Sequence, residues 1–261
     1  MLDYRTESMR ERLECREERR LLAQARRDRD VCWVEESEAE PLVTIRIATY
    51  NQAELVVDRA IASAQAQTYP RLEILVLGDH CDDPTRRAVE SINDPRLRFV
   101  DLPTRGMYPP RRAHLRKVAG SHPMNAGLFL ARGAWIAPCD DDDELTADHV
   151  EALLKTAKSG RLEMVYSKAR HEIRPDEWCV VGSEPLRMGE ICHGSVLYSA
   201  GLRFIRHSNT SWKMNEPSDW NLWKRMQRIG VRIGFLDRIT YTHYLGAKHR
   251  QPTTLISTDG S

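Results

Sequence analysis

The chain has 261 residues and a formal net charge of +1, because 39 lysines and arginines nearly balance 38 acidic residues. This length suits one large α/β domain with an appendage, and the balanced charge gives no general attraction to nucleic acid or to membranes. No apolar stretch approaches the ~20 residues that span a bilayer, and the N-terminus lacks the apolar core of a signal peptide. The six cysteines form no CxxC pair, so we expect a cytoplasmic protein with reduced thiols, no zinc ribbon and no transmembrane segment.

Residues 1–40 form a charged N-terminal arm that we expect to be helical. Arginine and glutamate recur three and four positions apart, as in an exposed, salt-bridged helix. The arm has too few leucines to bury a wide face, so a solvated arm is one interpretation. The arm nevertheless contains apolar side chains that must be buried, namely Leu21, Leu22, Val31 and Trp33. They favour a helix that packs on its own chain or on a second subunit of a homodimer.

From Pro41 onwards, strand-like and helix-like segments alternate. Runs of β-branched and apolar residues predict strands, and apolar residues at helical spacing predict helices. In chain order we predict a strand at 42–50, a helix at 53–67, a strand at 71–79, a helix at 83–92, a strand at 96–102, a helix at 125–133, a strand at 134–139, a helix at 145–160 and a strand at 161–167. Such alternation predicts a mostly parallel sheet with helices on both faces.

After about Ser167 the pattern changes. Residues 171–182 alternate and contain proline and glycine, which predicts an antiparallel strand or a hairpin. Residues 218–230 predict an amphipathic helix, and residues 231–244 predict two short strands around Asp237. The remaining tail is polar, and we expect it to be mobile.

Four consecutive carboxylates, Asp140 to Asp143, follow the strand predicted at 134–139. A solvated loop or the acidic first turn of a helix would also explain such a run. Asp79, however, ends another predicted strand, and ligands of parallel sheets bind beyond the carboxyl ends of the strands. The two acidic sites should therefore lie at one rim, where a divalent cation would relieve their repulsion.

Two segments carry motifs in a recognisable order. The first, VTIRIATYNQAELVVDRAIASAQAQTYPRLEILVLGD, has a strand ending near T-Y-N and a helix ending in Q-T-Y-P. The second, NAGLFLARGAWIAPCDDDDELTADHV, contains N-x-G, A-x-G-x-x-I and D-x-D-D. Together they resemble the family 2 glycosyltransferases, which are nucleotide-sugar enzymes of the GT-A fold. The likeness covers roughly residues 42–245 and weakens after Ser167. The order and spacing are specific, whereas a lone D-x-D is not.

The sequence departs from the family pattern in three places. The usual D-D-G-S reads GDHC, so only Asp79 of an acidic pair remains. Met124 stands where an arginine commonly precedes the asparagine of N-x-G. Residues 106–122 form a longer, strongly basic insertion, which would be a solvated loop, a lid over a diphosphate or an anchor for an acidic acceptor. These departures leave the sugar and the acceptor open.

The resemblance implies an α/β fold of GT-A type. This fold has a Rossmann-like, mostly parallel sheet flanked by helices, with a smaller antiparallel part on the acceptor side and, here, an N-terminal helical arm. It divides the chain into the arm at 1–40, a glycosyltransferase domain at 41–245 and a polar C-terminal tail at 246–261. Within the domain, 41–143 would bind the nucleotide and 144–245 the acceptor. The implied reaction is a metal-dependent, inverting transfer from a nucleotide sugar, with a UDP-sugar favoured.

The resemblance also assigns a metal site. The D-x-D positions match Asp140 and Asp142, which implies Asp142 as a direct ligand of Mn²⁺ or Mg²⁺. Asp140 would bind the ribose, or the metal through water, and Asp141 would lie beside the donor. His243 matches a late family position that completes the metal site, although a hydrogen-bonded core histidine is an equal alternative.

The expected donor pocket includes the base of the nucleotide. Asp79 matches a position that accepts a hydrogen bond from the uracil ring, with an ordinary turn residue as the alternative. The backbone of Ala48, Thr49 and Tyr50 should line the same pocket, and Asn125 of the N-x-G segment belongs to it. Arg46 is unusual in a buried strand. It would pair with a buried acid or reach the donor, and the sequence does not decide between the two.

Transfer needs a base that takes the proton of the acceptor nucleophile. The segment NEPSDWNLWKRM resembles the family's E-D-x-x-L-W, which implies Asp219 as the base and Glu216 as the alternate. A helix N-cap or an acid in the first turn of the helix is the structural alternative for Asp219. His193, Gly194 and Trp220 lie where relatives meet the acceptor or the sugar, with core packing as their alternative.

Two other functions compete with transfer. A nucleotidyltransferase on a similar sheet would carry a glycine-rich loop with arginine and lysine after the first strand, and ATYNQAE has none. A non-catalytic nucleotide-sugar or partner-binding module would bind UDP with a metal but without turnover, and the intact segment around Asp219 argues against it.

Overall fold

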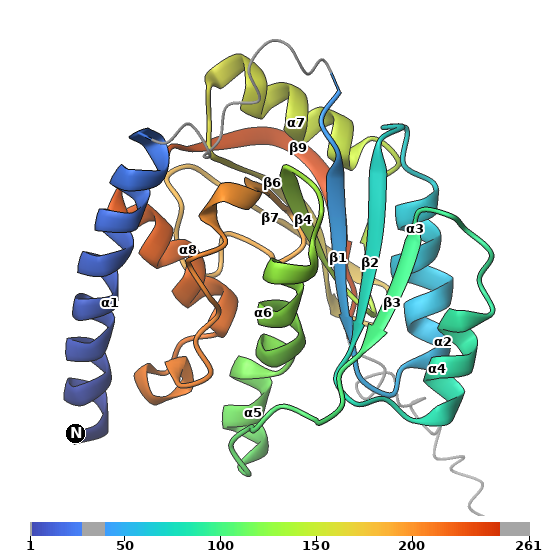
Figure 1. The fold of residues 1–261 in the computed structure, drawn as a ribbon, viewed down its shortest axis with the longest axis horizontal. Helices are drawn as coiled ribbons and strands as arrows, with labels where there is room; N and C mark the ends of the chain where they lie inside the picture. The colour runs from blue at the N-terminus through green and yellow to red at the C-terminus, as the bar shows by residue number, and fades with distance from the viewer. Residues whose placement is uncertain (1, 28–39, 246–261) are drawn as a thin grey trace, which may run out of the picture.

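A nine-stranded mixed sheet forms the centre of the described part of the protein, residues 2–27 and 40–245, and helices cover both faces (Figure 1). This computed structural model has the strands β1 Val43–Thr49, β2 Leu72–Gly78, β3 Leu97–Asp101, β4 Trp135–Asp140, β5 Glu144–Leu145, β6 Met164–Arg174, β7 Glu177–Val181, β8 Val196–Ser199 and β9 Ile233–His243. Their order in the sheet is β3-β2-β1-β4-β8-β6-β9-β5, and β7 pairs with β6 off this path.

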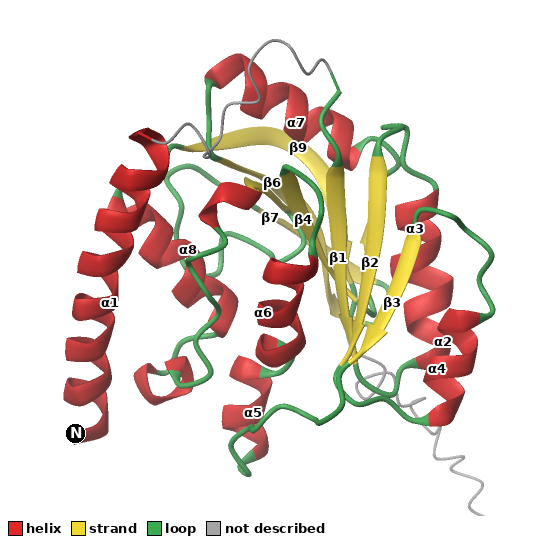
Figure 2. Cartoon of the chain, in the orientation of Figure 1, coloured by secondary structure: helices red, strands yellow, loops and turns green. Residues whose placement is uncertain are grey.

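The helices group into two layers and a long N-terminal helix (Figure 2). They are α1 Leu2–Arg27, α2 Ala53–Leu55, α3 Ala62–Gln65, α4 Asp83–Glu90, α5 Arg112–Val118, α6 Ser121–Leu130, α7 His149–Gly160 and α8 Ser218–Ile229. A π-helical segment, η1 Val56–Ile61, joins α2 to α3, so that the three form the helix predicted at 53–67. The 3₁₀ turns η2 Ala200–Leu202 and η3 Ser211–Met214 precede α8.

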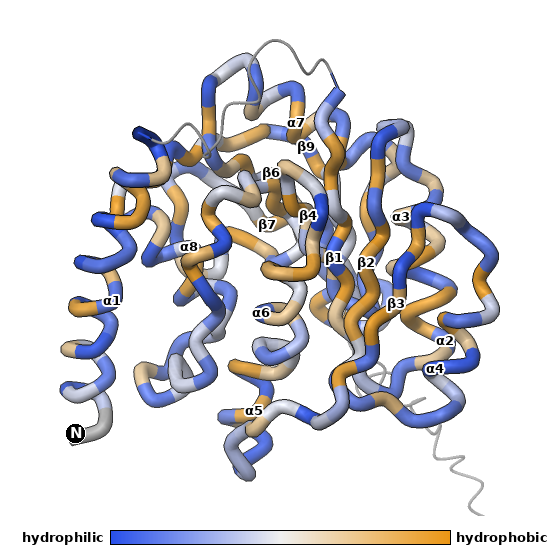
Figure 3. Tube along the Cα trace, viewed as in Figure 1, coloured by the Kyte–Doolittle hydropathy of each residue, from blue (hydrophilic) through white to orange (hydrophobic). Residues whose placement is uncertain are grey.

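The parallel part of the sheet follows the sequence prediction. β2 pairs in parallel with β1 and β3, and β1 pairs in parallel with β4. In β2, Leu72, Ile74 and Val76 join one hydrophobic cluster, whereas Leu75 and Leu77 join another. Successive side chains of a strand point to opposite faces, so β2 is buried on both. Figure 3 shows the resulting hydrophobic run along much of this strand.

The antiparallel part departs from the prediction at Asp237. The two short strands predicted around this residue are one long strand, β9, which pairs in parallel with β6. The pairing shifts register between Ser167 and Lys168, so that Asp237 and Arg238 fall outside the ladder. Such a bulge absorbs extra residues without ending the strand. Asp237 forms an ion pair with Lys168 at this point.

Three short elements, α5, β5 and β8, were not predicted from the sequence. Part of the insertion forms α5, and α6 begins at Ser121 rather than at residue 125. β8 is a four-residue strand that pairs antiparallel with β4 and β6. β5 has two residues, and α7 therefore starts at His149, later than predicted. These elements are too short for a periodic pattern to identify them.

The N-terminal helix packs on its own chain, against α8 and η3. Its buried residues are Glu7, Glu11, Cys15, Glu18 and Leu22, at the spacing of one helical face. Three of these five are glutamates, which meet cations and amides of the rest of the chain. The solvated-arm interpretation is therefore wrong, because the acidic residues, and not leucines, supply most of the docking face.

Glu11 anchors this helix most strongly. Its carboxylate accepts hydrogen bonds from Asn221 Nδ2 and Lys224 Nζ, each at 2.7 Å, and pairs with Arg228. We expect Glu11→Ala to lower the free energy of unfolding by about 3 kcal/mol, since removing one partner of a buried ion pair leaves the other charge uncompensated. Urea unfolding measures this change. Glu17→Ala is the control, because Glu17 pairs only with exposed Arg20, and equal stability of both variants would contradict the docking role.

The sequence also predicted the state of the cysteines, the absence of a transmembrane segment, the cellular location and the subunit arrangement. The five cysteines in the described ranges are free, as predicted. No described helix is long and apolar enough to cross a membrane. The cytoplasmic location, the homodimer and the division between residues 143 and 144 stay predictions, although β4 and β8 join both proposed halves in one sheet. Val31, Trp33 and the tail 246–261 lie outside the described residues.

Candidate active site

The carboxyl ends of β1, β2 and β4 surround a cavity of about 230 Å³. Its lining residues are Ala48, Thr49, Tyr50, Gln52, Asp79, Ala119, Gly120, Pro123, Met124, Asp140, Asp141 and Asp142. The strands and their parallel pairing bring these distant segments together at one rim, as expected for such sheets. Of the residues predicted to bind the donor, all except Asn125 line this cavity. We refer to it below as the rim cavity.

The acidic loop after β4 is crowded and partly buried. Asp141 Oδ2 accepts a hydrogen bond from Thr49 Oγ1 at 2.7 Å and lies 3.4 Å from the backbone nitrogen of Tyr50. Burial and the neighbouring carboxylates raise the pKa of Asp141 to about 8 and that of Asp142 to about 7. Arg59 Nη1 donates to the carbonyl oxygen of Asp142 at 2.6 Å, which fixes the loop from the side of η1.

Two aspartates of this loop form, together with a histidine of β9, a group that suits a cation. Ligand atoms of Asp140, Asp143 and His243 all lie within 4.8 Å of one another. Asp143 Oδ2 contacts His243 Nδ1 at 2.7 Å and accepts a hydrogen bond from the Tyr241 hydroxyl at 2.5 Å. Burial opposes a charged histidine, but the Asp143 contact and nearby carboxylates raise the pKa of His243 to about 9. Asp142 is not in this group, so its role as the direct metal ligand stays a prediction.

Asp79 lies in the rim cavity but already has partners. Its Oδ1 accepts a hydrogen bond from the Gly106 backbone nitrogen at 2.9 Å, and its Oδ2 accepts one from the Tyr108 hydroxyl at 2.6 Å. Each carboxylate oxygen has a second lone pair, so contact with a base remains available. Gly78 stands where the family has another acid, and a Cβ there would overlap the carboxylate of Asp101.

Arg105, directly before the basic insertion, contacts aromatic rings of two segments. The guanidinium of Arg105 lies 3.8 Å from the ring centroid of Tyr50 and 5.7 Å from that of Tyr108. Arg105 and Tyr50 are both exposed. These contacts connect the insertion to β1 and, through Tyr108, to Asp79. Ala119 and Gly120 of the insertion line the rim cavity, and residues 112–118 form α5, so the insertion is not a solvated loop.

The predicted base, Asp219, lies in the first turn of α8. Pro217 occupies the N-cap position, and no side chain caps the helix, so Asp219 is not the N-cap. It is the acidic residue of the first turn, as the other structural alternative predicted, and its role as the base stays a prediction. Its Oδ1 accepts a hydrogen bond from the Trp220 backbone nitrogen at 2.7 Å. Burial raises the pKa of Asp219, whereas the charge of His193 lowers it and that of Asp140 raises it. Asp219 is not among the residues that line the rim cavity.

Glu216, the alternate base, is held by an ion pair. Its carboxylate oxygens lie 2.6 and 2.8 Å from Lys224 Nζ, and Asn221 Nδ2 donates to one of them at 3.1 Å. Lys224 also contacts Glu11 of α1 at 2.7 Å. Lys224 and Asn221 thus occupy the Glu216 carboxylate, which leaves it less available to an acceptor hydroxyl.

The predicted acceptor-side residues occupy different surroundings. His193 is buried, and its Nδ1 contacts Asp140 Oδ1 at 2.8 Å while its Nε2 has no partner among the described residues. Gly194 makes room for Tyr241, since a Cβ at this position would overlap the tyrosine ring. Trp220 packs partly buried against the hydrophobic cluster under α8. Their roles toward a sugar or an acceptor stay predictions.

Arg46 forms no ion pair with any acid in the described segments, and it does not line the rim cavity. Its Nη1 donates to the Met124 carbonyl oxygen at 3.0 Å, and its Nη2 lies 3.4 Å from His207 Nε2. Asn125 binds the backbone of the same His207, donating at 3.0 Å and accepting at 2.8 Å. Both side chains thus hold α6 to the segment around His207. Asn125 faces away from the rim cavity, and its donor-binding role stays a prediction.

Three residues that sequence reasoning missed support the site. Tyr241 donates to Asp143, Arg59 holds the acidic loop, and Tyr108 donates to Asp79. Tyr241 stands two positions before His243 in a strand, so alternation would have placed both on one face. Nothing in the sequence pattern marks Arg59 or Tyr108, because their contacts depend on how the chain folds back.

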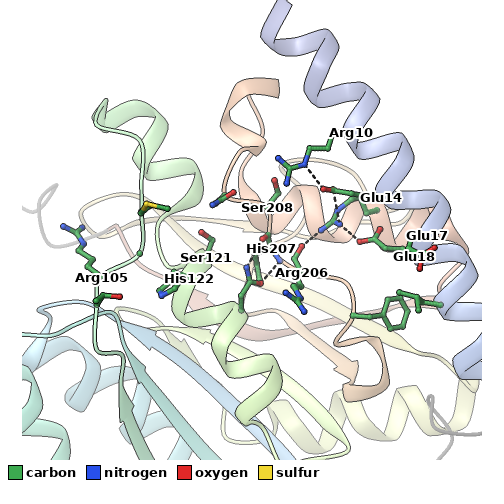
Figure 4. A pocket seen from close by; sticks show the side chains of 18 residues that line it. Arg10, Glu14, Glu17, Glu18, Arg105, Ser121, His122, Arg206, His207 and Ser208 are labelled. Carbon is green, nitrogen blue, oxygen red and sulfur yellow. Dashed lines mark hydrogen bonds and ion pairs between the residues drawn. The ribbon is translucent and has the colours of Figure 1, made fainter.

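A larger cavity, of about 880 Å³, lies on the other side of α6. In Figure 4, side chains of α1 such as Glu14 and Glu18 lie on one side of it, and Ser121, His122 and Arg105 lie on the other. None of the four aspartates after β4 lines this cavity. Cavity size alone therefore does not identify the active site.

Comparison with known proteins identifies similar sequences. The family model described as glycosyl transferase family 2 matches residues 44–189. The Escherichia coli protein "UDP-Glc:alpha-D-GlcNAc-diphosphoundecaprenol beta-1,3-glucosyltransferase WfaP" is 30% identical over 199 residues, which cover 73% of this chain and 72% of that protein. The chain spans only 20% to 30% of the length of three other curated relatives.

Solved structures show the same fold. S. aureus TarS 1-349 in complex with UDP has a TM-score of 0.60 at 18% identity, covering 78% of this chain and 60% of that one. The mannosyltransferase PcManGT from Pyrobaculum calidifontis, in complex with GDP-Man and Mn²⁺, has a TM-score of 0.56 at 19% identity, covering 93% of this chain and 68% of that one. The predicted GT-A architecture is therefore confirmed.

Proposed function

Because this chain belongs to glycosyl transferase family 2, we propose that it transfers a sugar from a UDP-sugar to an acceptor, with a divalent cation and inversion at the anomeric carbon. The observation that carries the proposal is the rim cavity, where the end of β1, Asp79 and the acidic loop meet. A nucleotidyltransferase has no support from the family match.

The donor assignment depends on the base. Asp79 lies in the cavity wall and has lone pairs for an N–H of uracil, while the same position of cytosine is an acceptor. The name of the Escherichia coli relative specifies UDP-Glc as its donor, and TarS was solved with UDP and with UDP-GlcNAc. These likenesses support a UDP-sugar.

The acidic loop fits a divalent cation. Mn²⁺ and Mg²⁺ bind carboxylate oxygens and imidazole nitrogens, and the loop offers Asp140 and Asp142, with His243 next to it. The raised pKa values of Asp141 and Asp142 reflect crowding that a cation relieves. His243 uses Nδ1 toward Asp143, which leaves Nε2 for a metal in the arrangement of a carboxylate-oriented ligand. When bound, the cation would neutralise the departing diphosphate.

The protein groups supply the remaining chemistry. Asp219 would accept the proton of the acceptor hydroxyl, and the raised pKa of its carboxyl makes it a stronger base. His193 would hold Asp140 through its Nδ1 contact. Direct attack by the acceptor oxygen, opposite the leaving nucleotide, inverts the configuration in one step.

The basic insertion suits an anionic acceptor group. Arg112 and Arg116 of α5 and Arg111 just before it are exposed and form no ion pair within the ranges described. α5 leads directly to Ala119 and Gly120 of the rim cavity. The acceptor named for the Escherichia coli relative is a diphosphate lipid. We therefore propose that the acceptor carries an anionic group, which these arginines would bind.

A calorimetric donor screen tests the proposal. We expect UDP to bind in Mn²⁺ or Mg²⁺ but not in EDTA, and to bind more tightly than CDP because Asp79 cannot donate to the ring nitrogen of cytosine. UDP-sugars should then be compared by slow hydrolysis without acceptor. Equal binding of UDP and CDP would remove the donor assignment. Metal-dependent binding of UDP with no hydrolysis of any UDP-sugar would favour the non-catalytic module.

A further inference from the structure

The long N-terminal helix separates its charges by face. Glu7, Glu11 and Glu18 are buried against the rest of the chain, where they meet Lys213, Lys224 and Arg225, respectively. In Figure 4, Glu18 points from the helix toward the domain. These three glutamates are used internally, whereas Glu17 is exposed and pairs with Arg20 of the same helix.

An exposed face of α1, beside the buried glutamates, carries arginines and apolar side chains. At its edge, Arg12 and Arg16 also line a cavity of about 510 Å³ that Glu11 and Glu216 share. Arg5, Met9, Arg12, Leu13 and Arg16 recur at the spacing of one helical face, and we name these five residues the outer stripe. All five are exposed, with Met9 at 67% and Leu13 at 59% of their full accessible surface. Arg5, Arg12 and Arg16 have no carboxylate partner in the part of the chain that the structure describes.

The outer stripe is unfavourable in water alone. Arg12 and Arg16 are four positions apart, where like charges repel each other, and Met9 and Leu13 expose apolar surface between the cations. A partner that is anionic at its surface and apolar beneath would reduce the repulsion between the arginines and would cover the apolar side chains. We propose that the outer stripe binds the surface of a bilayer that contains anionic phospholipid. Arginines would contact the headgroups, and Met9 and Leu13 would enter the interface.

Two other partners fit the outer stripe less well. A second copy that presents the same stripe would bring arginines against arginines. Nucleic acid would satisfy the charge but would give Met9 and Leu13 no apolar surroundings. The chain is nearly neutral overall, so the attraction comes from the local separation of charge. α1 is about 39 Å long at 1.5 Å per residue, and its buried glutamates would hold the domain at the bilayer in one orientation.

Vesicle sedimentation of the full chain tests the proposal independently of any enzymatic activity. We expect binding to an equimolar mixture of phosphatidylcholine and phosphatidylglycerol at low salt, loss of binding at high salt, and little binding to phosphatidylcholine alone. The triple variant Arg5→Gln, Arg12→Gln, Arg16→Gln should lower the partition coefficient on the order of 100-fold, at about fivefold per arginine. The double variant Met9→Ser, Leu13→Ser should lower it roughly tenfold.

A matched control removes the same charge elsewhere. Arg87, Arg161 and Arg187 are also exposed, and their triple replacement by glutamine should leave binding within about twofold of wild type. The melting temperatures should all agree, because none of the replaced side chains is buried. Equal loss in both triple variants, or no binding of wild type to anionic vesicles, would overturn the proposal. Binding of duplex DNA, or self-association lost only in the stripe variant, would also overturn it and assign the stripe to that partner.

Discussion

Replacing Asp219 by asparagine should lower the rate of sugar transfer by roughly 10²-fold or more, the usual effect of losing a general base. Asparagine has the same shape and keeps an oxygen that accepts the Trp220 N–H bond, which is 2.7 Å long in the wild type. Binding of UDP and the free energy of unfolding should therefore stay near wild type. Because the acceptor is unidentified, hydrolysis of a UDP-sugar by water is the first assay, and transfer follows once an acceptor is known.

Glu216→Gln is the matched variant for Asp219→Asn. Glu216 is paired with Lys224 and bonded to Asn221, so its replacement should reduce stability more than rate. If Glu216→Gln abolishes turnover while Asp219→Asn keeps it, Glu216 is the base. If wild type and both variants hydrolyse no UDP-sugar but bind UDP equally, the protein is a binding module.

Replacing Asp142 by alanine should weaken UDP binding in Mn²⁺ at least ~100-fold, since changes around a metal ligand already weaken binding 10- to 100-fold. In EDTA, wild type and variant should bind UDP equally weakly, because the cation that bridges protein and diphosphate is then missing from both. Titration calorimetry at constant ionic strength measures the four affinities. Asp83→Ala is the control for net charge, because Asp83 is an exposed acid of α4.

A third variant separates the two possible metal positions. Asp143 accepts hydrogen bonds from Tyr241 and the Tyr244 backbone and contacts His243, so Asp143→Asn should lower the melting temperature first. If Asp142→Ala binds UDP normally in Mn²⁺ and Asp143→Asn does not, the ion belongs to the group of Asp140, Asp143 and His243. The D-x-D assignment of Asp142 would then be wrong.

The sequence by itself determined the parallel half of the fold and the position of the rim cavity. β1, β2 and β4 are buried on both faces, so they appear in the sequence as largely apolar runs, interrupted by few polar residues such as Arg46 and Glu73. Parallel strands end at one edge, which is why Asp79 and Asp140 could be placed together without coordinates. The family motifs then assigned roles to these residues.

The tertiary structure decided what depends on contacts between distant segments. The glutamates of α1 look like surface residues in the sequence. Glu11 and Glu18 are buried because α1 packs against α8, where Lys224 and Arg225 pair with them. Arg46 looks like a buried ion-pair partner, yet the fold supplies a carbonyl and a histidine instead. β9 continues past Asp237 because Asp237 and Arg238 form a bulge in β9, after which its pairing with β6 resumes. Local patterns report periodicity along one element, whereas the partner of a buried charge is set by packing between elements, which no single segment encodes.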